Sequence, residues 1–405
     1  MKTILLVLLF LVNVYSSSKL ETNKTCKGCH PAIYAEFNQS AHRKSSIYED
    51  KIHKAAWGIH PDKAKNKYTC NECHTPSDTR ITNALAQGKM AVPIENDIQK
   101  HEAISCVYCH SIKTIESHAK SNDKNILTDK EKVFYSANKH KVNEKIKFQE
   151  EKSFFGMMKK TSGSPFHEID YSNKNFYTGK ICMGCHSNFE NQHGQNLWAV
   201  NDTKSCTSCH ADFENKEGLM ECPVNQEKNC LTCHMPKVKG SATTIKITKE
   251  HTFHGFAGTR NKYKMLSKYL KFNFLQTDTG FNITVKNEAT HNLLLNPLRL
   301  GKLNVRINNG SKTIKLDSTT FVRILGKDGK PSMSWEATGI YKDTMLKANE
   351  SRTIKYNTKV VSGNIIEVEF GYYLVNPEMA KELNLQNSKE TTDFKVLKTK
   401  FFTVE

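Results

Sequence analysis

Apolar and polar residues alternate through the last third of the chain, and this pattern predicts β-strands. In 281–285 and 303–307 every second residue is apolar, so one face of each strand is expected to meet a core. The same kind of pattern predicts further strands at Phe321–Leu325, Thr353–Thr358, Ile365–Phe370, Tyr372–Val375, Phe394–Val396 and Phe401–Val404. Asn308–Gly310 and Gly326–Gly329 are turn signals. Short strands at this spacing predict an antiparallel β-sandwich over 263–405, interrupted by one helix that opens at Asn376 with Pro377 in its first turn.

The preceding region has a different signature, because it repeats a five-residue motif instead of an apolar pattern. Six copies of Cys-x-x-Cys-His occur, and this motif is typical of c-type haem attachment. The two thiols bond to the porphyrin and the adjacent His ligates the iron from one face. Zinc sites and redox disulfides also use Cys-x-x-Cys pairs, but neither needs a His in the fifth position. The sequence therefore predicts six covalently bound haem c groups, attached at Cys26, Cys29, Cys70, Cys73, Cys106, Cys109, Cys182, Cys185, Cys206, Cys209, Cys230 and Cys233, with proximal ligands His30, His74, His110, His186, His210 and His234.

The second axial position of each iron decides what a haem can do. A second His closes the iron for electron transfer, whereas an open position allows substrate binding. The chain has 17 His, so eleven remain beyond the six in the motifs. This number is sufficient to close all six irons, although spacing does not say which His reaches which iron. The candidate distal ligands are His42, His53, His118, His167, His193, His251, His254 and His291.

The six motifs leave little polypeptide for a conventional core. Residues 26–234 supply roughly 35 residues for each motif, fewer than the ~40 below which chains usually rely on metals or cross-links. We expect the haems to form the core of this region, wrapped by short helices and loops. The whole chain is then predicted as α+β, with a haem domain over 19–262 and a β-sandwich domain over 263–405. A Lys-rich stretch at 111–165 carries no motif, and it is either a solvated insertion or the wall of a substrate channel.

The start of the chain predicts export. Lys2 precedes an apolar run from Ile4 to Val14 and a run of serines, which is the pattern of a secretory signal peptide, here over 1–18. The run is short for a membrane span, so the mature chain is expected to have no integral membrane segment and to be periplasmic, with an extracellular location as the alternative. The formal net charge is +18, but each haem adds two propionates and the lysines are spread along the chain. We therefore expect no nucleic-acid partner.

Several segments resemble one family. Cys26–His30, followed by Glu36–His42, resembles the opening of the multihaem cytochromes c related to the tetrahaem electron carrier of ammonia oxidisers. That group shares its haem packing with hydroxylamine oxidoreductases. The resemblance implies that His42 is a distal ligand, that His118 ligates after the third motif, and that His251 or His254 belongs with the last haem. Asn282–Arg306 is similar to the β-domain that follows the haems in such cytochromes. The Cys-x-x-Cys-Lys site of pentahaem nitrite reductases is absent from the sequence.

These observations predict a six-haem carrier of electrons between respiratory partners. The expected partners are inner-membrane quinol-linked cytochromes and terminal reductases or outer-surface acceptors, and the oligomeric state is left open. One alternative is a reductase or oxidase of nitrogen or sulfur oxyanions, with an open haem near Tyr135, Lys139 or His140. Another is a subunit of a haem filament joined through an exposed sheet edge. Cys222 is the one cysteine outside the motifs; it is a buried thiol, an intermolecular bridge or an unusual iron ligand.

Overall fold

The structure is a computed structural model of the chain, and it describes most but not all residues. The described residues are 22–115, 126–129, 133–152, 159–186, 188–190, 196–199 and 229–405. The predicted signal peptide, the motif Cys206–His210, His118, His193 and Cys222 lie outside them. Among the described helices, none is both long enough and apolar enough to cross a membrane.

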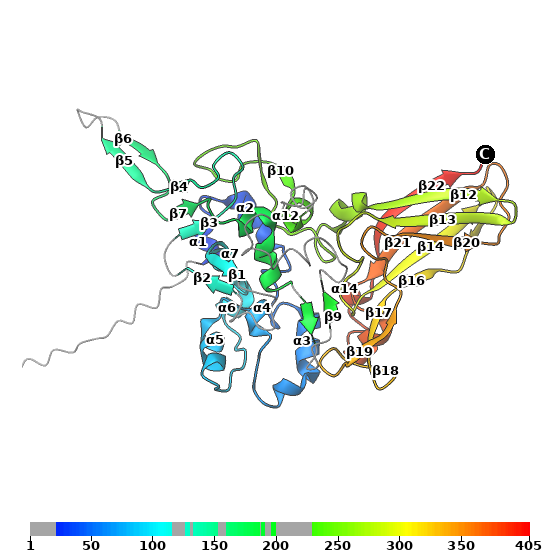
Figure 1. The fold of residues 1–405 in the computed structure, drawn as a ribbon, viewed down its shortest axis with the longest axis horizontal. Coiled ribbons are helices and arrows are strands. Elements are labelled where there is room, and N and C mark those ends of the chain that lie inside the picture. Colours follow the sequence, from blue (N-terminus) through cyan, green and yellow to red (C-terminus); the bar gives the residue numbers. More distant parts are fainter. Residues whose placement is uncertain are drawn as a thin grey trace, which may run out of the picture.

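Short helices and loops make up most of the region that carries the motifs (Figure 1). Asp50 caps the longest of these helices, α3, by accepting hydrogen bonds from the backbone N–H groups of Ile52 and His53, so the helix begins at a fixed residue. The helices of this region are α1 (Asn23–Cys26), α2 (Pro31–Asn38), α3 (Lys51–Ile59), η1 (Pro61–Lys63), α4 (Asn71–His74), α5 (Thr79–Ala86), α6 (Asp97–His101), α7 (Cys106–His110), α9 (Asn175–Thr178), η2 (Lys180–Gly184) and α12 (Cys230–His234).

Each described motif forms one helical turn. The backbone N–H groups of His30, His74 and His186 each donate to the carbonyl of the first cysteine of the same motif, at 2.9 Å, and the other two motifs are the helices α7 and α12. Side chains three and four residues apart share one face of a helix. The helical turn therefore places both thiols and the His of a motif on the same side, as attachment to one porphyrin requires.

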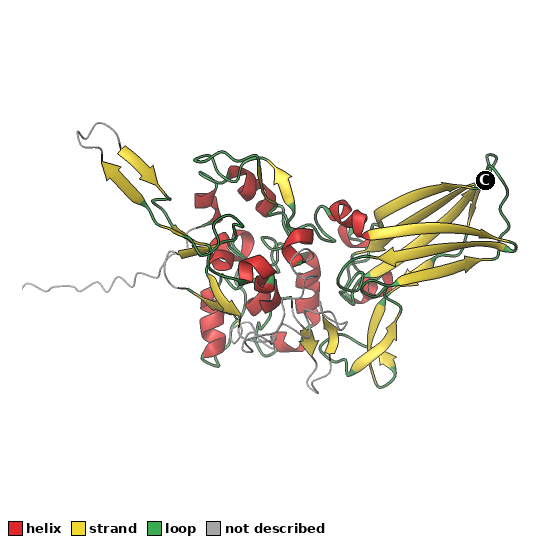
Figure 2. Cartoon of the chain, turned by 45° about the horizontal axis from the view of Figure 1, so that its top comes forward, coloured by secondary structure: helices red, strands yellow, loops and turns green. Residues whose placement is uncertain are grey.

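Small sheets accompany these helices. β1 (Ile112–Ile115) pairs with β2 (Ile126–Thr128), β8 (Asn188–Glu190) with β9 (Asn196–Ala199), and β10 (Lys237–Lys239) with β11 (Glu250–Thr252). A three-stranded sheet has β7 (Glu168–Asp170) in its centre, between β3 (Val133–Tyr135) and β4 (Lys145–Ile146). The hairpin of β5 (Gln149–Lys152) and β6 (Lys159–Ser162) projects away from the rest of the chain in both views (Figures 1 and 2). The Lys-rich stretch thus contributes both packed strands and an outlying hairpin.

Two larger sheets dominate the C-terminal region (Figure 2). One has the order β12-β13-β20, and the other has the order β15-β14-β21-β22 with β16 also paired to β14, all antiparallel. A third, small sheet contains β17, β18 and β19. The elements are η3 (Tyr263–Tyr269), β12 (Leu270–Thr277), β13 (Gly280–Asn287), β14 (Leu300–Asn308), β15 (Thr313–Lys315), β16 (Thr319–Phe321), β17 (Arg323–Lys327), β18 (Lys330–Pro331), β19 (Gly339–Asp343), β20 (Ser351–Tyr356), β21 (Ile365–Tyr373), α13 (Pro377–Glu382), α14 (Lys389–Thr392) and β22 (Lys395–Thr403).

Apolar packing is unevenly divided between the two regions. The inward faces of both larger sheets share one buried cluster, which includes Phe281, Ile283, Leu303 and Val368. The motif-bearing region has only smaller clusters among its described residues, one around Trp57 and Tyr68 and one around β1 and β2. The chain is therefore a mixture of helix and sheet, and the C-terminal sheets bury a core of their own.

The structure differs from the predicted strands in several places. The predicted strand Phe321–Leu325 is divided between β16 and β17, which belong to different sheets. β21 and β22 are single strands where the pattern predicted two shorter ones each. Gly371 interrupts the alternation in β21, and the pairing with β22 shifts register at this point. A side chain at Gly371 would meet the ring of Phe394 and the carbonyl of Lys395 at 2.5–2.6 Å, so the bulge requires glycine there. The strand β12 was not predicted, although the helix at Pro377 opens as expected.

Candidate haem-binding sites

Four motif histidines face a second histidine from a distant part of the chain. The partners lie in turns and loops that the sequence places at least 57 residues away. The distances between ring centres are 6.3 Å for His30 and His167, 6.3 Å for His110 and His254, 6.1 Å for His234 and His291, and 5.8 Å for His42 and His186. All four partners are among the candidate distal ligands predicted from the sequence.

Most of these rings form a hydrogen bond to a backbone carbonyl through their Nδ1 atom. The Nδ1 atoms in the first three pairs each bond a carbonyl, which leaves Nε2 as the nitrogen available for a metal. Such outer partners fix the ring orientation and raise the basicity of a ligating imidazole. The pairs are His30 with Ala242 (2.8 Å), His167 with Glu168 (3.4 Å), His110 with Tyr135 (2.7 Å), His254 with Thr252 (2.6 Å), His234 with Ala257, and His291 with Asn292 (2.9 Å).

The spacing of these pairs fits a metal between them. Two metal–imidazole bonds of about 2 Å each require about 4 Å between the nitrogens, and the ring centres lie further apart because each centre lies behind its nitrogen. Ring centres 6.1–6.3 Å apart meet this requirement. In the fourth pair the Nε2 atoms of His42 and His186 point at each other across 3.4 Å. The first three pairs therefore fit iron with two axial histidines, and the fourth pair has to open slightly to reach the same nitrogen spacing.

The second motif is arranged differently. The ring centres of His74 and His53 are only 4.1 Å apart, which is too short for a metal between them. The Nδ1 atoms of both rings approach the same carbonyl, that of Ser45, at 3.3 and 2.8 Å. The Nε2 atom of His53 is within 3.3 Å of the Tyr68 hydroxyl. The structure thus brings His53 to the motif, but it does not hold the two rings at an axial spacing.

His251 and His254 have separate roles in the structure. Both ring nitrogens of His251 are engaged, Nδ1 with the Gly240 carbonyl at 3.0 Å and Nε2 with a Glu36 carboxylate oxygen at 3.0 Å. The other Glu36 oxygen accepts from the backbone N–H of His254 at 2.9 Å. We therefore assign no iron to His251, and Glu36 holds the segment that presents His254 to His110. Sequence reasoning identified the two histidines but not the function of Glu36.

Burial keeps several of these imidazoles neutral. It lowers the pKa of His42 to about 3, of His186 to about 4 and of His254 to about 4, and it lowers those of His110 and His291 as well. Neighbouring histidines add to the effect for each of them. A neutral imidazole is the form that binds a metal, so these side chains are in the required state at neutral pH.

Contacts between cysteines show which motifs are neighbours. The thiol of Cys182 is hydrogen-bonded to Cys230, that of Cys185 to Cys73, and that of Cys106 to Cys26. Cys109 also lies close enough to Cys182 and Cys185 to affect their ionisation. The fourth motif, Cys182–His186, is therefore adjacent to the second, third and sixth motifs.

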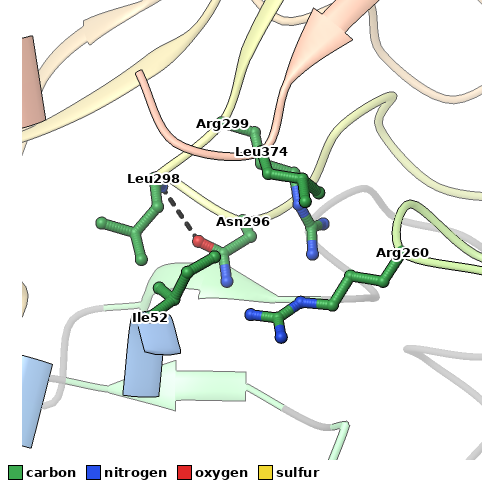
Figure 3. A pocket seen from close by; sticks show the side chains of 6 residues that line it. All are labelled: Ile52, Arg260, Asn296, Leu298, Arg299 and Leu374. Atoms are coloured by element: carbon green, nitrogen blue, oxygen red, sulfur yellow. Dashed lines mark hydrogen bonds between the residues drawn. The ribbon is translucent and has the colours of Figure 1, made fainter. Parts of the chain in front are cut away.

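The C-terminal region meets the motif-bearing region through several specific contacts. His291 reaches His234, and the Tyr372 hydroxyl donates to the Thr259 carbonyl at 2.8 Å. A small cavity lies at this interface between Ile52 of α3 and residues 296–299. Figure 3 shows the guanidinium groups of Arg260 and Arg299 at this cavity, with the Asn296 side chain turned back to the Leu298 N–H.

Other residues predicted near an open haem do not gather into a pocket. Lys139 and His140 are exposed, and Tyr135 is buried with its hydroxyl donating to Asp129. His118, His193 and the fifth motif lie outside the described residues. Tyr68 and Phe256 contact His53 and His42, and no pattern in the sequence marked either of them as part of a site.

Comparisons with known proteins show two similarities, one to a family model and one to a solved structure. Residues 25–111, which hold the first three motifs, match the family model "Cytochrome c554 and c-prime". These findings support a multihaem c-type cytochrome with covalently bound haem c. The chain is also similar in fold to the crystal structure of a penta-heme cytochrome c552 from Thermochromatium tepidum, with 19% identity and a TM-score of 0.65, covering 95% of this chain and 99% of that one. A search of curated proteins found no match.

Proposed function

We propose that this chain is an exported electron-transfer cytochrome that holds six haems, most of them closed by two histidines. The facing histidine pairs are the observation that supports this most directly. An iron with two axial histidines has no free position for a substrate, so such a site suits electron transfer rather than catalysis. The family match over the first three motifs and the likeness to a penta-heme cytochrome agree with a multihaem carrier.

The proposed axial ligands follow the pairs described above. His167 is proposed for the first motif, His254 for the third, His42 for the fourth and His291 for the sixth. His118 and His193 remain predicted ligands for the rest. When bound, the haem irons supply one-electron chemistry.

The side chains and carbonyls of this chain prepare the sites for that chemistry. In the pairs at the first, third and sixth motifs, backbone carbonyls hold the Nδ1 protons of the histidines, which leaves Nε2 to face the metal. Burial keeps the imidazoles neutral and excludes water from them. Both effects favour fixed six-coordinate sites that need little rearrangement when the charge at the metal changes.

The proposed partners are redox proteins met outside the cytoplasm. The positive formal charge of the chain, +18, favours the approach of acidic partners. The bis-histidine ligation proposed here gives lower potentials than ligation by His and Met, which suits donors linked to the quinol pool. The predicted signal peptide supports a periplasmic location over an extracellular one.

A second candidate function rests on the second motif. His53 and His74 lie 4.1 Å apart without room for a metal between their rings, so the Cys70–His74 site is the best candidate for an iron that is open on one side. An open haem in this cytochrome would favour a reductase of nitrogen or sulfur oxyanions.

Spectroscopy of the purified holoprotein distinguishes the two functions. Intact mass should show six haems, and electron paramagnetic resonance of the oxidised protein should show low-spin signals only. Carbon monoxide should leave the spectrum of the dithionite-reduced protein unchanged. A high-spin signal that responds to nitrite, hydroxylamine or sulfite, and that disappears in His74→Ala but persists in His140→Ala, would favour the reductase.

A further inference from the structure

We propose that the His42–His186 pair holds the haem with the highest reduction potential among the five described sites. Phe256 holds the ring of His42 steeply inclined to that of His186, and the Nδ1 atom of His42 has no hydrogen-bond partner among the described residues. Electrons that enter the chain are then held at this site. The inference rests on the bis-histidine ligation proposed above and adds a specific function for one site and one positioning residue.

The first observation concerns the outer nitrogen of His42. Its Nδ1 atom is buried and has no hydrogen-bond partner among the residues that the structure describes. In the pairs at the first, third and sixth motifs, the Nδ1 atoms meet backbone carbonyls. A hydrogen bond donated from Nδ1 makes an imidazole a stronger electron donor, and this stabilises the oxidised metal. Without that bond His42 stabilises the ferric state less, which raises the reduction potential.

The second observation is the angle between the two rings. The planes of His42 and His186 are 71° apart, whereas the other three pairs are 14–30° apart. Two parallel imidazoles donate into the same iron d orbital, but two perpendicular imidazoles donate into different ones. The perpendicular arrangement leaves those orbitals nearly equal in energy, which again stabilises the ferric state less. It also gives a highly anisotropic low-spin resonance that parallel pairs do not show.

Phe256 is the residue that maintains this orientation. Its ring meets that of His42 edge-on, with centres 4.2 Å apart at 85°. Its backbone lies in the left-handed region, with φ at 53°, which is unusual for a bulky side chain. Strained conformations of this kind persist where the surrounding structure fixes them, and they concentrate at functional sites. The strain here places an apolar ring against an axial histidine whose buried Nδ1 has no hydrogen-bond partner among the described residues.

The surroundings of the pair act in the same direction. Arg299 lies near His186, and together with Arg260 it lines the small cavity between α3 and the C-terminal region. A nearby positive charge favours reduction, because reduction lowers the positive charge at the metal. The fourth motif is also adjacent to three others, so an electron can reach it from several sides.

A reductive titration of the purified holoprotein, followed by electron paramagnetic resonance, tests the proposal. Dithionite supplies single electrons, each reducing one ferric iron to ferrous without breaking a bond. We expect a highly anisotropic low-spin signal that disappears before the rhombic signals do. The proposal is overturned if this signal is absent or disappears last.

Two variants assign the signal to this site. Asn tolerates the left-handed backbone of position 256 and offers an amide oxygen to His42, so Phe256→Asn should convert the anisotropic signal to a rhombic one and shift its reduction to lower potential. Phe134→Asn is the matched control, because Phe134 lies 4.6 Å from the ring of His167, whose Nδ1 already has an acceptor. The control should leave every signal unchanged.

A third variant remains informative if Phe256→Asn fails to fold. Arg299→Gln should lower the potential of the anisotropic signal and leave its shape unchanged. If neither Phe256→Asn nor Arg299→Gln moves that signal, this inference fails while the carrier function stands. If the protein lacks haem or shows no low-spin signals, the proposed function itself fails.

Discussion

Glu36 offers a direct test of how the chain positions an axial ligand. Its two carboxylate oxygens accept hydrogen bonds from the His251 ring and from the backbone N–H of His254. Glu36→Ala removes both acceptors and leaves the His251 ring, 3% exposed, without a partner for Nε2. Hydrogen bonds to charged groups contribute about 1.5–3 kcal/mol each. Because both bonds share one carboxylate that is 20% exposed, we expect a combined loss of about 2–4 kcal/mol rather than the full sum.

Guanidinium unfolding of the holoprotein measures this loss, and the oxidised spectrum reports on His254. Glu36→Gln keeps one acceptor oxygen, so it should cost about half as much as Glu36→Ala. Glu36→Ala should also produce a high-spin fraction at a single haem, since His254 loses its anchor. Glu378→Ala is the control, because Glu378 is exposed and pairs only with Lys381, which predicts a change of about 0.5 kcal/mol or less. Equal stability of Glu36→Ala and the control, with unchanged spectra, would refute the reasoning.

Three further changes have defined outcomes. His291→Ala should open one iron, so the oxidised holoprotein should gain one high-spin signal per chain, and an unchanged resonance spectrum would contradict the pairing with His234. Burial raises the pKa of Glu102 from 4.5 to about 7. Between these two pH values the folded chain therefore binds more protons than the unfolded chain. The free energy of unfolding should fall as the pH rises from the lower value to the higher one. Glu102→Gln should abolish that slope in urea titrations, and a slope retained in the variant would count against Glu102. Ile283→Ala empties part of the shared sheet core, where Ile283 is 0% exposed, and should cost about 2–5 kcal/mol in denaturant unfolding; a loss under about 1 kcal/mol would show that the core relaxes around the cavity.

Local patterns in the sequence were sufficient to locate the attachment motifs and most of the longer C-terminal strands. A Cys-x-x-Cys-His motif needs only one helical turn, and the turn forms from neighbouring residues. The alternation at 281–285 and 303–307 reports directly on one buried face. Gly371 misled the prediction, because a glycine at a bulge resembles a strand end until its partner strand is known.

Pairing of the histidines could not be predicted in the same way. His30 and His167, or His110 and His254, meet only after the chain has folded over long distances, and sequence spacing carries no information on such contacts. Glu36 illustrates the same limit, since the role of its carboxylate depends on hydrogen-bond partners 215 and 218 residues away. The unpaired Nδ1 of His42 is visible only when every neighbouring atom is placed.

The contacts of His30 have a consequence for how the molecule is built. A ribosome completes the first motif long before it reaches Ala242, whose carbonyl holds the His30 ring, and Thr244, whose N–H binds the Cys29 carbonyl at 2.9 Å. The earliest motif to be synthesised thus gains its final surroundings after the last motif has been made. Closing so long a loop is slow. Maturation enzymes would therefore meet the first thiols on an open, unfolded segment.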